Sequence, residues 1–173
     1  MKRALLAAGA VLAFAGCASL RDALAPAPVG KPSSRLGWLV YELHELQFEG
    51  LAAWKPAGGE RRVALEAPDG RARLEVTYRD DFAEAKACLA DAEERLRQQE
   101  GAFERARRHP TRFAGRPAQT LEGDQGGWHV WAYAVCDGAV QYRVFFTSMS
   151  PTSPEALDAY RSLVGSARIG GSA

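Results

Sequence analysis

The alternation of apolar and polar residues predicts a β-hairpin over residues 63–76. Two alternating stretches flank Asp69-Gly70, a strong signal for a tight hairpin loop. A two-residue loop at this point places Leu65 opposite Leu74, and every apolar residue of both strands then lies on one face. The pattern therefore predicts the pairing register as well as the strands.

A second hairpin is predicted over residues 128–148. Its strands are joined by Asp137-Gly138, a signal for a type I′ turn. If these two residues form the loop, Val135 lies opposite Val140 and one face of the hairpin is strongly aromatic. Cys136 then lies on the other face, where smaller side chains allow a helix to approach. The further pairs expected on the aromatic face are Tyr133 with Tyr142 and Trp131 with Val144.

A long amphipathic helix is predicted to begin at Asp81. Glu84 follows three residues later, and this spacing is typical of a capping box. The helix is expected to end at Gly101 or to continue to Arg108, before Pro110 stops it. Its predicted buried stripe contains Phe82, Ala85, Leu89, Ala92 and Leu96, with Cys88 beside it.

A last helix is predicted to begin after Ser153, which can cap it, with Pro154 at its first position and Gly165 as its stop. Its expected apolar stripe contains Leu157, Tyr160, Leu163 and Val164.

The other segments complete the expected order of elements. Residues 36–46 carry apolar side chains at helical spacing and predict a short helix or an irregular segment, whereas residues 47–54 and 118–122 read as strands. A hairpin, a long helix, several antiparallel strands and a final helix define an α+β fold, in which helices pack on a mainly antiparallel sheet.

The N-terminus has the layout of a secretory signal. Lys2 and Arg3 precede an apolar run over residues 4–14, which is too short to span a membrane. The segment Phe14-Ala15-Gly16-Cys17 resembles the lipobox of bacterial lipoproteins, in which the cysteine becomes the acylated (palmitate-bearing) first residue. Phe14 departs from that motif, where leucine is usual.

The resemblance implies a signal peptide over residues 1–16 and a membrane partner through a lipid on Cys17. Ala18 after the cysteine then favours the outer membrane, with the protein facing the periplasm. A rival interpretation remains open, because Ala13-Phe14-Ala15 is also a site for ordinary signal peptidase. Cleavage after Ala15 would release a soluble secreted protein.

Composition divides the rest of the chain. Residues 17–35 contain the cysteine and a Pro/Ala/Ser-rich stretch that predicts a tether. Residues 36–169 form one expected domain, and residues 170–173 a disordered tail. With 22 basic and 21 acidic residues in the whole chain, the charge gives no reason to expect a nucleic-acid partner.

The cysteine count adds a second inference. If Cys17 carries lipid, Cys88 and Cys136 remain as an even pair in an oxidising compartment, which predicts a disulfide between them. The alternative is two buried thiols.

Catalytic and metal-binding signatures are weak. The three histidines, His44, His109 and His129, are far apart and form no ligand pair, so no metal site and no cofactor are expected. No nucleophile motif is present, so no catalytic residue is assigned and a non-enzymatic role is expected. The alternative is a small envelope hydrolase that uses His129 or His44 with a nearby carboxylate.

Two surface features are candidates for binding. Trp128, Trp131 and Tyr133 lie on one strand, and Trp131 and Tyr133 alternate on one of its faces, although aromatics in that pattern usually belong to a core. Five arginines lie close together around Pro110, which indicates either a patch for an anionic partner or a solvated helix end. They are Arg105, Arg107, Arg108, Arg112 and Arg116.

The order of elements resembles the Mog1/PsbP-like α/β/α sandwich over roughly residues 46–169. The resemblance is carried by the two hairpins, the helix from Asp81, the segment 115–118 and the closing segment 163–166. It implies an accessory protein that binds an envelope partner, and it transfers no site residue, because fold alone does not define function.

Replacement of Cys17 by alanine is expected to abolish acylation and to leave the uncleaved precursor, because the lipid is attached to this sulfur. Palmitate labelling and intact mass would measure both effects. Normal processing after Ala15 in the C17A variant would contradict the lipoprotein interpretation.

Overall fold

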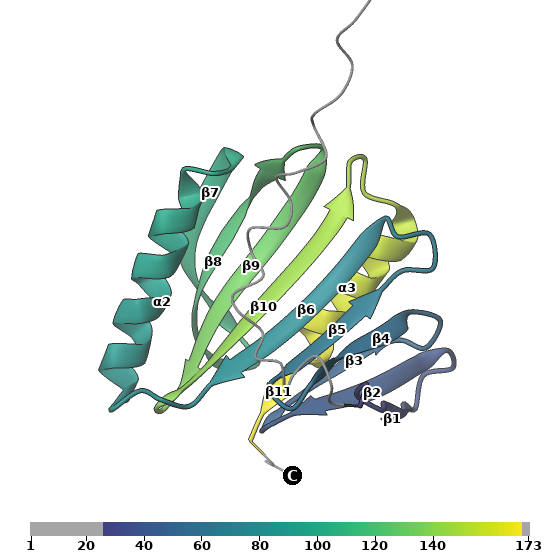
Figure 1. Ribbon diagram of the computed structural model, residues 1–173, viewed down its shortest axis with the longest axis horizontal. Helices are drawn as coiled ribbons and strands as arrows, with labels where there is room; N and C mark the ends of the chain where they lie inside the picture. The colour runs from purple at the N-terminus through teal and green to yellow at the C-terminus, as the bar shows by residue number, and fades with distance from the viewer. Residues whose placement is uncertain (1–25, 171–173) are drawn as a thin grey trace, which may run out of the picture.

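The computed structural model describes residues 26–170, which form two antiparallel sheets and two helices (Figure 1). The larger sheet has seven strands in the order β4-β5-β6-β10-β9-β8-β7, and the smaller has the order β1-β2-β3-β11. The smaller sheet consists of β1 (Lys31–Pro32), β2 (Trp38–Leu43), β3 (Leu46–Leu51) and β11 (Arg168–Ile169). The larger consists of β4 (Lys55–Gly59), β5 (Arg62–Glu66), β6 (Ala72–Arg79), β7 (Glu104–Phe113), β8 (Arg116–Gln125), β9 (Trp128–Asp137) and β10 (Val140–Met149).

The two helices lie on opposite faces of the larger sheet. Helix α2 (Ala85–Glu100) runs along the β7 side, and α3 (Pro154–Ser166) lies behind β5 and β6 (Figure 1). The main apolar core lies between the larger sheet, α3 and the smaller sheet, and a separate small cluster lies under α2. The predicted class, an α+β fold with helices on a mainly antiparallel sheet, is confirmed.

The first predicted hairpin is present in its predicted register. Leu65 lies opposite Leu74 and Val63 opposite Val76, and all four side chains are buried. The Asp69 carboxylate accepts a hydrogen bond of 3.0 Å from the Arg71 backbone N–H, which closes the turn.

The second hairpin has the predicted faces but a different register. Asp137 pairs with Val140, so the loop is Gly138-Ala139 and each expected pair is shifted by two residues. Gly138 has φ +57 at the first central position, where type II′ turns favour glycine. Asp137 is the last residue of β9, and its carboxylate forms an ion pair of 3.0 Å with Arg116. A shift of two leaves every side chain on its original face, so the apolar pattern could not distinguish the two registers.

The long helix begins later than the capping pattern predicts. It starts at Ala85 after Glu84, whose side chain makes no capping hydrogen bond. Asp81 instead forms an ion pair of 2.9 Å with Arg79, so the predicted capping box is wrong. The buried stripe is Cys88, Ala92 and Leu96, whereas Ala85 and Leu89 are exposed. The helix ends at Glu100, before Gly101, and the alternative extension to Arg108 is wrong because residues 104–113 form β7.

The final helix has the predicted start. The Ser153 hydroxyl accepts a hydrogen bond of 3.1 Å from the Ala156 N–H. The helix continues past Gly165 to Ser166, and its buried side is rotated from the predicted stripe. The buried residues are Ala156, Ala159, Ser162 and Leu163, because small side chains allow α3 to approach the sheets closely.

Residues 36–46 contain no helix. They form β2 and the start of β3, joined by a tight turn at His44-Glu45. Apolar residues at helical spacing are also compatible with two short strands around a turn. The pairing of β2 with β3, in which Tyr41 stacks on Phe48 with a centroid distance of 5.9 Å, favours the strands over the helix.

The folded part begins before residue 36, so the predicted tether is too long. Lys31 pairs with Val40 in β1, and Arg35 binds the Glu49 carboxylate at 2.9 Å while its guanidinium lies over the Trp38 ring. These contacts fix a stretch whose composition resembles a spacer.

The structure contains the predicted Cys88–Cys136 disulfide, which joins α2 to β9. Both cysteines are buried in the cluster under α2. The signal segment, Cys17 and the tail after residue 170 lie outside the described residues. Between residues 26 and 170, neither helix is long and apolar enough to cross a bilayer.

Replacement of both Cys88 and Cys136 by alanine is expected to lower the free energy of unfolding by about 4 kcal/mol, because the disulfide restricts a long loop of the unfolded chain. Urea unfolding followed by tryptophan fluorescence would measure the loss. Reducing agent should destabilise the wild-type protein comparably and leave the double variant unchanged. Equal stability of the variant and the oxidised wild type would contradict the stabilising role.

Candidate functional site

A cleft of about 470 Å³ lies at the border between the two sheets. Three segments that are distant in the sequence form its walls: residues 28–32, residues 40–47 and the β4–β5 turn with Gly59 and Glu60. Its volume lies within the range of small-ligand sites. Val29 and Val40 contribute apolar surface, and its polar side chains come from Lys31, Glu42, His44, Gln47 and Glu60.

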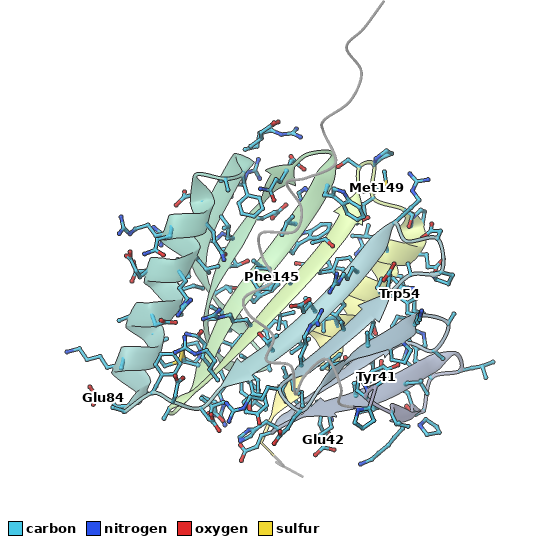
Figure 2. All side chains as sticks on the ribbon, viewed as in Figure 1. Tyr41, Glu42, Trp54, Glu84, Phe145 and Met149 are labelled. Atoms are coloured by element: carbon cyan, nitrogen blue, oxygen red, sulfur yellow. A yellow bond between two sulfur atoms is a disulfide. The ribbon has the colours of Figure 1, made fainter. Side chains whose placement is uncertain are left out.

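The outer edge of β2 is open at this cleft. Strand β1 covers only Leu39 and Val40. Trp38 directs its backbone N–H and C=O to the β1 side, where they bond Arg35 and Ser33. Backbone groups alternate along a strand, so those of Glu42 point the same way, past the end of β1. Within residues 26–170, no strand pairs with Glu42 on that side. Its side chain lies at the rim of the molecule (Figure 2).

His44 stands at the turn that ends β2, in a left-handed conformation with φ +54. Its Nδ1 is 3.0 Å from the hydroxyl of the buried Tyr142, which also accepts a 3.3 Å bond from the Glu45 N–H. Burial raises the pKa of Tyr142 to about 12, so the hydroxyl stays protonated. The Tyr142 hydroxyl finds an acceptor for its proton when it donates to Nδ1 of His44. In a neutral imidazole the ring proton then lies on Nε2.

This arrangement leaves the Nε2–H of His44 as a donor without a partner among the described residues, at the wall of the cleft. The Tyr78 ring supports the imidazole at a centroid distance of 4.9 Å. Left-handed backbone is uncommon outside glycine, although histidine tolerates it better than most residues. The turn, the buried tyrosine and the ring stack together hold His44 in place.

A second polar cluster surrounds His129 on the α3 side of the sheet. Its Nδ1 is 2.7 Å from the Asp124 carboxylate and its Nε2 is 3.1 Å from that of Glu122. The ring meets the edge of Trp131, which stacks on Tyr160 at 4.6 Å. An imidazolium donates to both carboxylates, whereas a neutral ring donates to only one. The cluster is therefore an acid–base–acid clamp between β8 and β9.

The polar side chains around this clamp are held by ion pairs or hydrogen bonds. The hydrogen bond from His129 lowers the pKa of Asp124 against the opposing effect of burial, and Arg105 at 2.5 Å adds to the lowering. The Tyr133 and Tyr160 hydroxyls bond each other at 2.5 Å, and burial raises the pKa of both.

The predicted arginine cluster lies along the edge strand β7 and at the start of β8, so its interpretation as a helix end is wrong. Three of the five arginines have acidic partners: Arg105 binds Asp124, Arg108 binds Glu100 at 3.2 Å, and Arg116 binds Asp137 at 3.0 Å. Arg112 donates to the Gly115 carbonyl, and Arg107 lies opposite Glu122 in the ladder.

Strand β7 also has features that discourage further strand pairing. A register shift separates Glu104 from Arg107, and Pro110 lacks an N–H in the middle of the strand. Bulges, prolines and charges are the usual protections of an exposed sheet edge. Three of the arginines therefore neutralise neighbouring acids, and the charges of β7 protect this edge.

The two histidines of the hydrolase alternative lie in separate clusters. Both nitrogens of His129 are bonded to carboxylates, which leaves no free nitrogen to take a proton from a nucleophile. His44 bonds Tyr142, and it shares the cleft with Glu42 and Glu60. Trp131 and Tyr133 pack against the core, as their alternation predicts.

Within residues 26–170 no group of three or more His, Cys, Asp or Glu side chains is arranged so that it could hold a metal ion. Sequence reasoning did not find the cleft, because its walls come from segments whose proximity no local pattern reports.

The comparisons with known proteins identify the fold. No family model and no curated protein sequence matches the chain. The solution structure of cyanobacterial PsbP (CyanoP) from Synechocystis superposes with a TM-score of 0.56 at 11% identity, over 82% of this chain and 98% of that one. A crystal structure from Bacteroides thetaiotaomicron gives 0.52 at 10% identity, over 72% of this chain. The match spans only 45% of that longer protein. These similarities show a PsbP-like α+β fold.

Replacement of Asp124 by asparagine is expected to make the free energy of unfolding fall less steeply as the pH is lowered. Its folded-state pKa is lowered, so the ionised carboxylate contributes stability that is fully present above the unfolded pKa, about 4. That stability is lost as pH falls through the folded pKa. Urea unfolding across a pH series would measure it.

The matched control is Asp158→Asn, an exposed position on α3 for which no ion pair is found within residues 26–170. If the unfolding free energy of the Asp124 variant fell as steeply at acid pH as that of this control, the contribution of the Asp124 carboxylate to stability would be contradicted.

Proposed function

We propose that this protein is a lipid-anchored, non-catalytic binding module of the bacterial cell envelope, held at the outer membrane through Cys17 and facing the periplasm. The observation that carries the proposal is the pairing of Cys88 with Cys136. Because Cys88 and Cys136 are bonded to each other, Cys17 is the cysteine that remains as a candidate for the lipid attachment.

The disulfide also supports the compartment. Disulfides persist in oxidising environments such as the periplasm and are rare in the cytosol. The bond lies in a buried cluster, where it serves the fold. The layout of residues 1–17 supports export independently of the disulfide.

The geometry of the folded part supports binding over catalysis. The clamp at His129 is satisfied by its own carboxylates, and three of the five arginines are paired with acids. The border cleft is the surface that combines volume, unpaired backbone groups and a free donor. A PsbP-like fold agrees with an accessory role, although fold similarity alone assigns none.

Fractionation combined with crosslinking in intact cells tests the proposal. The full chain is expected in the outer-membrane fraction, and a membrane-permeant crosslinker should yield a specific product with an envelope protein. Ser19→Ala serves as the matched control for Cys17→Ala: it should stay in the membrane fraction, whereas C17A should lose mature lipid-linked protein.

Two results would overturn the proposal. Recovery of the wild-type protein only in the soluble fraction with Gly16 as its first residue would support the secreted alternative. Absence of any crosslinked species that exceeds the background would count against a binding role.

A further inference from the structure

We infer that the border cleft binds an extended peptide segment of a partner protein, which adds to the outer edge of β2 at Glu42 and contacts His44. The inference rests on the proposed binding function and identifies the site and the partner's chemistry. It is carried by the open strand edge, the shape of the cleft and the position of a free imidazole donor.

The open edge of β2 offers a backbone donor and a backbone acceptor that can bond the main chain of a peptide. The N–H and C=O of Glu42 point outward beyond the end of β1, which stops opposite Val40. An extended segment placed there continues the antiparallel pairing that Lys31 begins. Addition of a strand to an exposed edge is an established mode of peptide recognition, in which main-chain hydrogen bonds provide affinity.

His44 extends the row of donors along the cleft. Its Nε2–H lacks a protein partner within residues 26–170, and Tyr142 and Tyr78 hold the ring in place. A carbonyl of the bound segment is the acceptor that such a donor recognises. A pre-positioned ring loses little conformational freedom on binding, which favours the contact.

The walls of the cleft favour a peptide over a small charged ligand. Lys31 already forms an ion pair of 3.4 Å with Glu42, and Glu60 adds a negative charge on the opposite wall. These charges are mixed, so they select neither an anion nor a simple cation. Val29 and Val40, which are exposed and half-buried, provide an apolar surface for one side chain of the segment, and Pro28 and Pro32 form a firm wall.

A phage-displayed library of random linear 12-residue peptides, selected against the purified mature protein, provides the probe. Selected peptides are expected to bind about tenfold more weakly to His44→Asn, which loses the ring donor and keeps a residue that tolerates left-handed backbone. The matched control, His109→Asn, changes an exposed histidine on β7 and should leave affinity unchanged.

Hydrogen exchange supplies a readout that does not depend on a variant. The Glu42 amide should exchange freely in the unbound protein and become at least about tenfold protected with saturating peptide. Protection confined to other strands, or equal binding to wild type and His44→Asn, would overturn the inference. Failure to enrich any peptide above the uncoated support would overturn it as well.

One further outcome also contradicts it. If residues 18–25 of the chain itself occupy the cleft, the Glu42 amide is protected before any peptide is added, and deletion of these residues exposes it. These results leave the proposed envelope function untouched, because localisation and crosslinking in cells test that function separately.

Discussion

The antiparallel pairing of β6 with β10 is the constraint on which the rest of the structure depends. It joins residues 72–79 to residues 141–148 and merges the β4–β6 and β7–β10 strands into one sheet. Val76 lies opposite Val144 at its centre, and both are fully buried. Because this pair lies mid-sheet, one of its faces supports the core shared with α3 and the smaller sheet, and the other supports the α2 side. The border cleft lies away from this centre, where the smaller sheet meets the β4–β5 end of the larger sheet.

The α2 side combines a small apolar cluster with the disulfide and a network of polar contacts. Gln141, fully buried, donates to the Cys88 carbonyl at 3.2 Å and to Asp91 at 3.0 Å, and accepts a 2.8 Å bond from Arg143. Burial lowers the pKa of Arg143 to about 10. Burial acts to raise the pKa of Asp91, but hydrogen bonds from Arg95 and Gln141 outweigh it and keep the carboxylate ionised. The disulfide and this network position a helix whose apolar stripe is narrow.

Much of the fold could be predicted from local patterns, and the site could not. The hairpin over residues 63–76 was predicted with its register because a single tight turn accommodates the alternation. The second hairpin was shifted by two residues, since its two strands also pair with β8 and β6, which lie elsewhere in the chain. Strand β7 carries no alternating pattern, and its pairing with β8 gives it its conformation. The cleft combines residues 28–32, 40–47 and 59–63, which come together only after both sheets have formed.

The sequence alone determined which residues of each main hairpin share a face and where their turns fall to within one residue, and it favoured a bridge between Cys88 and Cys136 over two thiols. These properties follow from a side-chain period of two, from turn chemistry and from a count of three sulfurs. Only the tertiary structure decided the order of strands, the register of the second hairpin, the strand conformation of residues 38–43 and the surroundings of His44 and His129. The physical reason is that these features depend on contacts between segments far apart in the chain, whose energies no local pattern contains.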